Sequence, residues 1–408
     1  MLSWANRFNI CCFLDNHQYT FSSGSIECLL AAGSKKSLSL NAGNALLCFQ
    51  EFYDDAQDWV FGHLGYDLKN EIEDLVSTHR DGLHFPDLYF FIPEIIVKLT
   101  TTELIVGAEG NTHESIFNDI TRISVSSVPS TPGPVAISNR YTKEEYIAVI
   151  GHLQQHLSKG DCYEINFCQE FYAENAVIDP LQIYRLLSAS SPNPFSAFYK
   201  TDDKYLLCLS PERYLKKEGR RILSQPIKGT LKRSKEQDQN GITQLMGNAK
   251  ERAENIMIVD LVRNDLSRIC KKGSVKVDEL CAVYAFPQVY QMISTISGEL
   301  REEVTVSEAI RASFPMGSMT GAPKKKVMQL IEHYERTRRG LFSGSIGYFT
   351  PEGDFDLNVV IRSVLYNDTE NYLSFQTGSA ITFASNPEEE YAECLLKAAV
   401  IKNALLAI

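Results

Sequence analysis

A lysine stands between a proline and a glycine in the sequence Ser224-Gln-Pro-Ile-Lys-Gly-Thr230, directly after a short predicted strand at residues 221–223. Such a tight loop could point the amine of Lys228 into a cavity. An amine attacks carbon only when it is neutral, and a reference pKa near 10.4 leaves about one molecule in a thousand neutral at pH 7.4. Nucleophilic chemistry would therefore require burial or a nearby positive charge to lower the pKa of Lys228. Without either, the residue is typical of an exposed loop lysine.

Two pairs of glutamates repeat the pattern Glu-x-x-Glu, Glu251 with Glu254 and Glu390 with Glu393. Each pair falls in a predicted helix, at residues 244–262 and 387–407, where side chains three apart share one face. Two such faces brought together could offer carboxylate oxygens to a hard divalent cation, for which Mg²⁺ is the best candidate. A single pattern of this kind is more often a solvated acidic face. Here, however, Glu254 adjoins a largely apolar run, and Lys397 follows Glu393 by one helical turn.

A loop rich in glycine precedes the helix predicted at residues 323–335. It begins at Phe314 and contains Gly317, Thr320 and Gly321. Free backbone amides at the first turn of a helix can receive a carboxylate or a phosphate. The pattern is common before helices, and it lacks the spacing of a Walker A nucleotide-binding loop. Alone it is a weak indication of an anion site.

A predicted strand–loop–strand at residues 344–384 carries a tyrosine, Tyr348, and an arginine, Arg362. Arg362 falls within a predicted strand of valine and isoleucine, residues 358–364, and a guanidinium in such surroundings usually has an anionic partner. That partner could be a neighbouring Asp or Glu or a bound ligand, and the sequence favours neither. A stretch of small residues, Thr377–Ala380, follows.

The elements that would position these residues follow a proline-rich seam. Residues 124–140 include three prolines and a glycine and are expected to be a linker. They would separate an N-terminal α+β segment, residues 1–123, which packs on the main body, from a catalytic domain at residues 141–408. That domain opens with a predicted helix, capped by Thr142 and Glu145 as a capping box.

Strands are also expected at residues 45–49, 94–99, 162–172, 205–209 and 372–376, and a further helix at residues 306–313. Strands and helices arrive in runs, without regular β-α alternation and without a dinucleotide-binding glycine loop. This order favours an α+β fold over a doubly wound sheet.

The charge and cysteine content exclude several classes of protein. The 408 residues include 40 Lys and Arg against 51 Asp and Glu, a formal net charge of −11. A general binder of nucleic acid or anionic membrane needs a surplus of cations. The sequence has no signal-peptide pattern and no apolar run of the about 20 residues that cross a bilayer. The 10 cysteines form no C-x-x-C pair, so we expect reduced, mostly buried thiols in a cytoplasmic protein.

Together these motifs resemble the chorismate-utilising enzymes, which include anthranilate, aminodeoxychorismate, isochorismate and salicylate synthases. The resemblance covers residues 141–407, about two thirds of the chain. Its signatures, in the family's order, are Ser210–Arg213, Ala253–Asp265, Phe314–Lys324 and Gly344–Tyr348. It implies the fold of anthranilate synthase component I, a large two-layered β-sandwich with surrounding helices.

Within the family, one lysine selects the chemistry that the resemblance implies. Aminodeoxychorismate synthases carry Pro-Ile-Lys-Gly-Thr, whereas anthranilate synthases carry alanine at the position of Lys228. Isochorismate and salicylate synthases place a water-activating lysine where this chain has Glu164. The resemblance therefore implies amination of chorismate at C4, giving 4-amino-4-deoxychorismate for 4-aminobenzoate and folate synthesis. The alternative is amination at C2 with elimination of pyruvate, as in anthranilate synthase component I.

The resemblance also implies a role for each candidate residue. Lys228 would attack ring C2 while Glu212, acting as general acid, protonates the departing C4 hydroxyl. Glu254 and Glu393 would bind Mg²⁺, with Glu251 and Glu390 supporting them. Chorismate would be bound by Tyr348, Arg362, Gly378, Lys397, Thr320 and Gly321. Mg²⁺, Arg362 and Lys397 would also lower the pKa of Lys228.

The sequence departs from the family pattern in two places. Gln291 stands where members often have histidine, and an amide cannot carry a proton. The loop around Gly378 contains fewer glycines than the same loop in other family members, since it has Thr377, Ser379 and Ala380. Each added Cβ limits how closely the backbone can approach a ligand. These departures permit a protein that binds chorismate without converting it, although the joint presence of the predicted catalytic and metal-binding residues disfavours that reading.

The source of ammonia is implied to lie outside this chain. The sequence has no Gly-x-Cys-x-Gly nucleophile elbow of a glutamine amidotransferase, so the resemblance implies a separate glutaminase subunit as partner. No length remains for the lyase that would release pyruvate, and we expect the product to be 4-amino-4-deoxychorismate.

Overall fold

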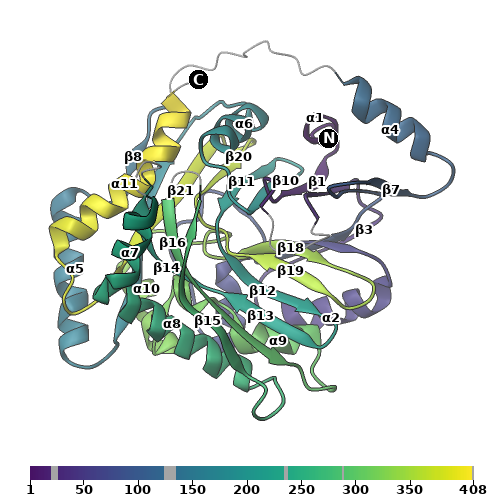
Figure 1. The fold of residues 1–408 in the computed structure, drawn as a ribbon. Coiled ribbons are helices and arrows are strands. Elements are labelled where there is room, and N and C mark those ends of the chain that lie inside the picture. Colours follow the sequence, from purple (N-terminus) through teal and green to yellow (C-terminus); the bar gives the residue numbers. More distant parts are fainter. Residues whose placement is uncertain (20–25, 124–134, 234–237, 287–288, 407–408) are drawn as a thin grey trace.

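The computed structural model describes residues 1–19, 26–123, 135–233, 238–286 and 289–406, which form two large antiparallel sheets (Figure 1). The first sheet has eleven strands. In order across the sheet they are β17 (Gly321–Ala322), β9 (Glu164–Ala173), β21 (Tyr372–Ile381), β20 (Ser363–Asn367), β11 (Lys204–Ser210), β10 (Phe195–Thr201), β1 (Ile10–Asp15), β2 (Cys28–Ala32), β6 (Ile95–Leu99) and β7 (Leu104–Ala108), with β8 (Ser138–Asn139) paired to β9.

The second sheet has ten strands. In order they are β14 (Ile227–Lys232), β16 (Val289–Glu299), β13 (Arg221–Gln225), β12 (Arg213–Glu218), β19 (Phe355–Asn358), β18 (Ser345–Phe349), β4 (Val60–Leu64), β5 (Leu88–Ile92) and β3 (Lys36–Leu40), with β15 (Lys276–Ala285) paired to β16. The two sheets and the helices around them confirm the predicted α+β class and its two-layered sandwich.

The N-terminal third of the chain contributes to both sheets. Strand β1 pairs with β10 in the first sheet, and β4 pairs with β18 in the second. Figure 1 shows the purple β1 beside the teal β10. Residues 1–123 and 141–408 therefore share both layers. Of the predicted linker, residues 124–134 lie outside the described residues, and Ser138–Asn139 forms β8.

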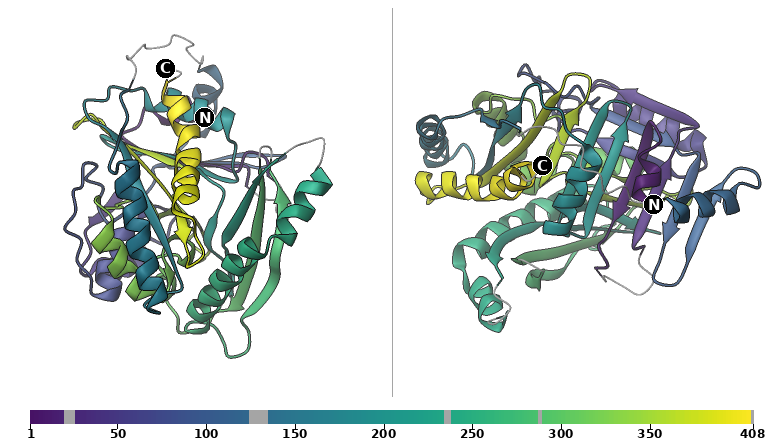
Figure 2. Two further views of the ribbon diagram at one scale, coloured as in Figure 1. Left: turned by 90° about the vertical axis from the view of Figure 1, so that its left-hand side faces the viewer. Right: turned by 90° about the horizontal axis from the view of Figure 1, so that it is seen from above.

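Helices cover the outer faces of the two sheets. They are α1 (Leu2–Ala5), α2 (Ala45–Ala56), α3 (Lys69–Glu73), α4 (His113–Arg122), α5 (Lys143–Ser158), α6 (Pro180–Ser190), α7 (Asp238–Gly247), α8 (Ala249–Ser267), α9 (Val306–Ser313), α10 (Lys324–Tyr334) and α11 (Pro387–Leu406). One core lies between the sheets and continues under α2, α8 and α9, and a second lies between the first sheet and α5, α6, α10 and α11. Figure 2 shows α11 lying across the strands of the first sheet. Among the described helices, none combines the length and the apolar character that crossing a bilayer requires.

Several local predictions are confirmed. Helix α5 begins with the predicted capping box, in which the Thr142 hydroxyl accepts the backbone N–H of Glu145 and the Glu145 carboxylate accepts that of Thr142. Helix α9 occupies the predicted residues 306–313. The predicted helix at residues 244–262 is divided at Asn248, whose side chain caps α8 by accepting the backbone N–H groups of Lys250 and Glu251.

Three predictions of local structure are wrong. Residues 45–49 begin helix α2 instead of forming a strand, because Ala45, Leu46, Phe49 and Phe52 recur at helical spacing and form its buried face. The predicted strand at 358–364 is broken, since β19 ends at Asn358 and β20 begins at Ser363. Residues 377–380 lie inside strand β21 and not in a loop.

Candidate active site

Lys228 lies on β14, the edge strand of the second sheet, and faces β9 of the first sheet. Strand β13 ends at Gln225, the chain bends at Pro226, and Lys228 is the second residue of β14. Its side chain is 10% exposed, and its amine lies 2.9 Å from a carboxylate oxygen of Glu164 on β9 of the first sheet. The interpretation as an exposed loop lysine is therefore wrong, because the bend turns the amine inward between the sheets.

The next residue is a glycine because the backbone there has little room. Gly229 has φ +94°, a conformation that side chains disfavour, and a Cβ at this position would lie 3.1 Å from a carboxylate oxygen of Glu251. The Pro-Ile-Lys-Gly-Thr sequence thus brings the main chain of β14 close to helix α8, which also has contacts with β14.

Carboxylates surround the Lys228 amine. Burial by itself lowers the pKa of Lys228. The opposite effect of the neighbouring negative charges is larger, so the pKa lies above its usual value; these charges belong to Glu164, Glu254 and Glu212. The prediction that Mg²⁺, Arg362 and Lys397 together would lower this pKa concerns the metal-bound site and stays a prediction. In the chain by itself, the three carboxylates raise the pKa of Lys228. The amine is therefore held as an ammonium ion until a proton is removed.

Glu212 lies where the chain passes from the first sheet to the second, between β11 and β12. Its backbone N–H donates to the Ser210 hydroxyl at 3.2 Å, and its carbonyl accepts the N–H of Val359 at 3.0 Å. Burial raises the pKa of the Glu212 carboxyl to about 7, although Ser318 and Lys228 oppose the rise. A carboxyl that is substantially protonated near neutral pH can serve as a general acid.

Arg362 lies on the second crossing between the sheets, between β19 and β20. Its φ is +51°, and its carbonyl accepts the N–H of Leu209 on β11 at 3.3 Å. The bond from the Val359 N–H to the Glu212 carbonyl joins the two crossings to each other. Burial lowers the pKa of the guanidinium, and Glu212 opposes that effect. No hydrogen bond or ion pair of this guanidinium occurs within the described ranges. The sequence left open whether the partner of Arg362 is a neighbouring carboxylate or a bound anion. The absence of a partner among the described residues favours a bound anion.

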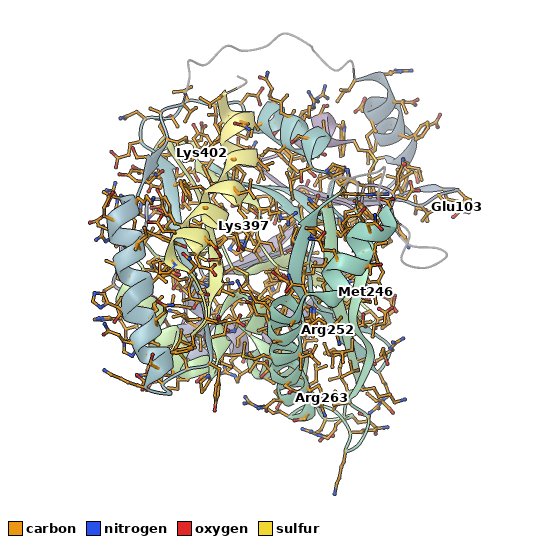
Figure 3. The ribbon with its side chains drawn as sticks, turned by 60° about the vertical axis from the view of Figure 1, so that its left-hand side comes forward. Glu103, Met246, Arg252, Arg263, Lys397 and Lys402 are labelled. Carbon is orange, nitrogen blue, oxygen red and sulfur yellow. The ribbon has the colours of Figure 1, made fainter. Side chains whose placement is uncertain are left out.

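Helices α8 and α11 carry the two predicted acidic pairs. Figure 3 shows the two helices, with Arg252 labelled on α8 and Lys397 on α11. The Lys250 ammonium lies between the two acidic pairs, 3.3 Å from an oxygen of Glu390 and 3.9 Å from an oxygen of Glu254. Burial raises the pKa of Glu254 to about 7. Burial, and then the charge of Glu393, raises the pKa of Glu251. These carboxylates lie in each other's electric field, which is unfavourable unless a cation is present.

The residues fit a hard cation, although they do not form a closed cage. Within the part of the chain that the structure describes, no three His, Cys, Asp or Glu side chains converge on one point. One buried oxygen of Glu254 and one of Glu390 have no hydrogen-bond partner. Glu393 is 45% exposed and pairs with Lys397 at 2.7 Å. Carboxylate oxygens that are free, together with an open side, suit Mg²⁺, which keeps several of its waters.

The remaining predicted residues have mixed surroundings. The ring of Tyr348 on β18 packs against Trp59 and Phe61, with centroids 5.4 and 5.9 Å apart. Burial raises the pKa of its hydroxyl, and the charges that act on it most are Asp356 and Arg213. The paired clamp of Tyr348 and Arg362 thus stays a prediction.

Gly378 and Lys397 contact each other directly. The Lys397 amine donates to the Gly378 carbonyl at 2.9 Å. Gly378 lies opposite Cys168 on β9, where a Cβ would come within 1.9 Å of the Phe167 carbonyl, so only glycine fits. Because this residue lies in a strand, its flanking side chains Thr377, Ser379 and Ala380 alternate between the faces of the sheet.

Thr320 and Gly321 hold β9 in place. The Thr320 hydroxyl donates to the Met316 carbonyl at 3.0 Å, and the Thr320 carbonyl accepts the N–H of Asn166 at 2.8 Å. Gly321 pairs with Ile165 and has φ +141°, and a Cβ there would lie 2.1 Å from the Glu164 carbonyl. The Thr320 side chain is therefore already engaged, and the backbone of Gly321 fixes Glu164.

Sequence reasoning missed a buried ion pair that supports this corner of the site. Arg339 is 2% exposed, pairs with Glu335 at 2.6 Å, and donates to the carbonyls of Met319 and Asn166. The only signal for it in the sequence was a Glu and an Arg four residues apart. Gln291 on β16 is fully buried, and neither of its amide atoms has a hydrogen-bond partner within the described residues.

Comparison with known proteins gives the family. The family model described as chorismate binding enzyme matches residues 9–403. The chain is 32% identical over 371 residues to aminodeoxychorismate synthase component 1 of Bacillus subtilis, covering 86% of this chain and 78% of that protein. It is 35% identical over 355 residues to the anthranilate synthase component I-like protein of Synechocystis sp., covering 85% and 72%.

A solved structure has the same fold. Anthranilate synthase component I from Streptococcus pneumoniae superposes with a TM-score of 0.82 at 24% identity, covering 95% of this chain and 94% of that one. The predicted fold is therefore confirmed, and the family match extends into the N-terminal segment that the motifs did not reach. The chain belongs to the family of chorismate binding enzymes.

Proposed function

We propose that this chain is the synthase subunit of an aminodeoxychorismate synthase, which aminates chorismate at C4. The observation that carries the proposal is Lys228, whose buried amine lies beside Glu164 and acts on the Glu212 carboxyl. The relative from Bacillus subtilis has the corresponding name. An anthranilate synthase would carry no nucleophile at this position, by the family pattern given above.

The chemistry is two successive displacements. The Lys228 nitrogen forms a bond to ring C2, the ring double bond shifts, and the C4–O bond breaks while Glu212 gives its proton to the departing hydroxyl, which leaves as water. Ammonia then forms a bond to C4, and the bond between Lys228 and C2 breaks. Covalent attachment replaces one difficult substitution with two easier ones.

Charge explains how a dianionic substrate could bind among carboxylates. Two unit charges about 4 Å apart repel by about 4 kcal/mol at an effective dielectric of 20. Glu254 and Glu393, supported by Glu251 and Glu390, would hold Mg²⁺, and a bound Mg²⁺ would supply the positive charge that receives the ring carboxylate. The unpartnered guanidinium of Arg362 would receive the other carboxylate.

Removal of the metal is expected to abolish product formation. With EDTA, no product should form, and added Mg²⁺ should restore the rate. Glu254→Gln should raise the Mg²⁺ concentration needed for half the maximal rate by about tenfold or more, since it replaces a charged ligand by a neutral one. Glu218→Gln, at the exposed end of β12, is the control. An unchanged Mg²⁺ requirement in Glu254→Gln would count against this ligand set.

Arg362→Gln is expected to weaken substrate binding without weakening the fold. A charge-assisted hydrogen bond contributes about 1.5–3 kcal/mol, so kcat/KM should fall by about 10- to 100-fold. The thermal midpoint of the free protein should not fall, because no intramolecular partner is lost. Arg213→Gln is the contrast, since Arg213 binds both oxygens of Asp356 and its loss should lower the midpoint. Equal loss of stability in both variants would contradict the assignment.

Identification of the product tests the proposed function. The chain, chorismate, Mg²⁺ and ammonium should give 4-amino-4-deoxychorismate by chromatography, and 4-aminobenzoate only after a separate lyase is added. Addition of a glutaminase subunit should allow glutamine to replace ammonium. Anthranilate fluorescence that develops without a lyase would favour the alternative, amination at C2 with elimination of pyruvate.

A further inference from the structure

Glu164 is an unusually isolated buried carboxylate. Its side chain has no exposure to solvent, and apart from the Lys228 ammonium neither of its oxygens has a hydrogen-bond donor within the described residues. The Lys228 ammonium lies 2.9 Å away and is the one ion-pair partner of Glu164 in the part of the chain that the structure describes. A carboxylate kept in this state is costly, because burial of a charge must be offset by its partners. Since no other donor among the described residues engages these oxygens, they are available to exchange a proton with Lys228.

The main chain holds this carboxylate in a fixed position. Strand β9 pairs on one side with β21 and on the other with β17, where Gly321 lies against the Glu164 carbonyl. Two residues further on, the Asn166 side chain donates to the Ser318 carbonyl at 2.8 Å. Glu164 is therefore presented by a strand that is bonded on both edges, opposite the first residues of β14.

Other charged groups face the Lys228 amine from every neighbouring element. They are Glu212 on the crossing between the sheets, Glu251 and Glu254 on α8, and Glu393 on α11, while Arg362 acts on Glu212. Of these, Glu212 is needed in its protonated form in the proposed function, and Glu254 and Glu393 are proposed for the metal. Glu164 is the carboxylate in contact with the amine that has no other task.

We propose that Glu164 is a positioning residue that holds the Lys228 amine and accepts its proton before the amine attacks chorismate. The inference rests on the proposed function. The Lys228 N–H bond breaks, its proton passes to a Glu164 oxygen, and the freed electron pair forms the bond to ring C2. When the amine leaves C2 after ammonia has attacked, the proton returns from Glu164 and restores the ion pair.

This proton transfer has a recognisable pH dependence. In the resting form, Lys228 is charged, Glu164 is ionised and Glu212 is protonated. Transfer of the Lys228 proton to Glu164 leaves the total number of protons in the site unchanged, so the abundance of the reacting form follows that of the resting form. That form prevails below about pH 7, the pKa of Glu212, so formation of the adduct should be fastest there and slow as the pH rises. If Lys228 instead lost its proton to solvent, the reacting form would have one proton fewer, and the adduct would form faster above pH 7.

The experiment measures the rate at which the Lys228 adduct forms in a single turnover. Full-length protein is mixed with chorismate and saturating Mg²⁺ without ammonium, quenched, and analysed by denaturing mass spectrometry between pH 5.5 and 9. Glu164→Gln keeps the size of the side chain and can still accept a hydrogen bond, but it cannot take a proton. Glu164→Asp keeps the carboxylate and serves as the conservative variant.

The matched control is Glu170→Gln on the same face of β9. Glu170 is also buried, but it binds Arg140, Tyr372 and Ser374 and makes no contact with Lys228. Thermal unfolding of each variant shows whether the protein is folded at the temperature of the assay. Loss of rate in Glu164→Gln but not in folded Glu170→Gln separates proton transfer from general effects of a missing buried charge.

In Glu164→Gln, we expect the adduct to form about 10²- to 10⁴-fold more slowly at pH 6, and the remaining reaction to be faster above pH 7 than below it. Glu164→Asp should recover part of the rate and the wild-type pH profile. An adduct that forms as fast as in the wild type, or faster, would overturn the inference and leave the proposed function intact. A wild-type protein that yields 4-amino-4-deoxychorismate without any adduct would overturn the covalent step and this inference together.

Discussion

Lys228→Ala is expected to remove the covalent intermediate and to lower the rate of amination by more than about a thousandfold. Without ammonium, wild-type protein mixed with chorismate should gain the mass of chorismate less one water, and peptide mapping should place the addition on Lys228. The variant should show no addition. The expectation follows from a buried amine that lies near the proposed general acid.

The same substitution is expected to destabilise the protein, so it needs a companion. Removal of Lys228 leaves Glu164 as a buried charge without a cation, and loss of one partner of such a pair costs about 3–5 kcal/mol. Lys228→Arg keeps a cation beside Glu164, but a guanidinium does not become neutral near pH 7. It should fold normally and still give no adduct. Lys217→Ala on β12, whose amine binds Gly353 and Asp354, should react as the wild type does. An adduct in Lys228→Arg would refute the assignment of the nucleophile.

Glu212→Gln is expected to slow formation of the adduct by about 10²- to 10⁴-fold, because an amide has no proton to give to the departing hydroxyl. Binding of chorismate should change little, since Glu212 acts on the leaving group. The measurement is again the single-turnover rate, together with KM and kcat in the presence of ammonium. A decrease of less than tenfold in kcat would show that another group provides the proton.

Glu212→Gln should not weaken the fold at alkaline pH, and this separates its chemical role from a structural one. The carboxyl has a raised pKa in the folded state, so its contribution to stability is present below the unfolded pKa of about 4.5 and is lost as the pH rises through about 7. A glutamine amide does not ionise, so the variant does not lose stability as the pH rises through this range. The thermal midpoint of the variant at pH 8 should therefore equal or exceed that of the wild type.

The sequence predicted those features that depend on local pattern. Glu251 and Glu254, and Glu390 and Glu393, were expected on helix faces, and α8 and α11 do carry them. The α+β class followed from strands and helices arriving in runs. The prediction of a strand at residues 45–49 was wrong because five consecutive apolar residues fit a strand and a buried helix face equally well. Only the continuation of the helical spacing to Phe52 distinguishes the two structures.

Other features depend on contacts between distant segments and could not be read locally. The pKa of Lys228 was expected to fall beside Mg²⁺, Arg362 and Lys397, whereas in the chain by itself three carboxylates from β9, α8 and the turn after β11 raise it. No property of residues 224–230 shows how many acids will face them. The break in the strand at 358–364 was equally hidden, because valine and isoleucine favour a strand, and the turn at Arg362 arises only where β19 and β20 join different sheets.

The sharing of both sheets by the N-terminal third has a consequence for any attempt to shorten the protein. Strand β10 pairs with β1, and β18 pairs with β4, so removal of residues 1–123 would bare the long edge of two sheets at once. Uncovered edges of this kind recruit strands from other molecules. A fragment that begins at residue 141 should therefore aggregate on expression, and residues 1–123 should be kept in any version of the protein made for engineering, for fusion to a partner subunit or for crystallisation.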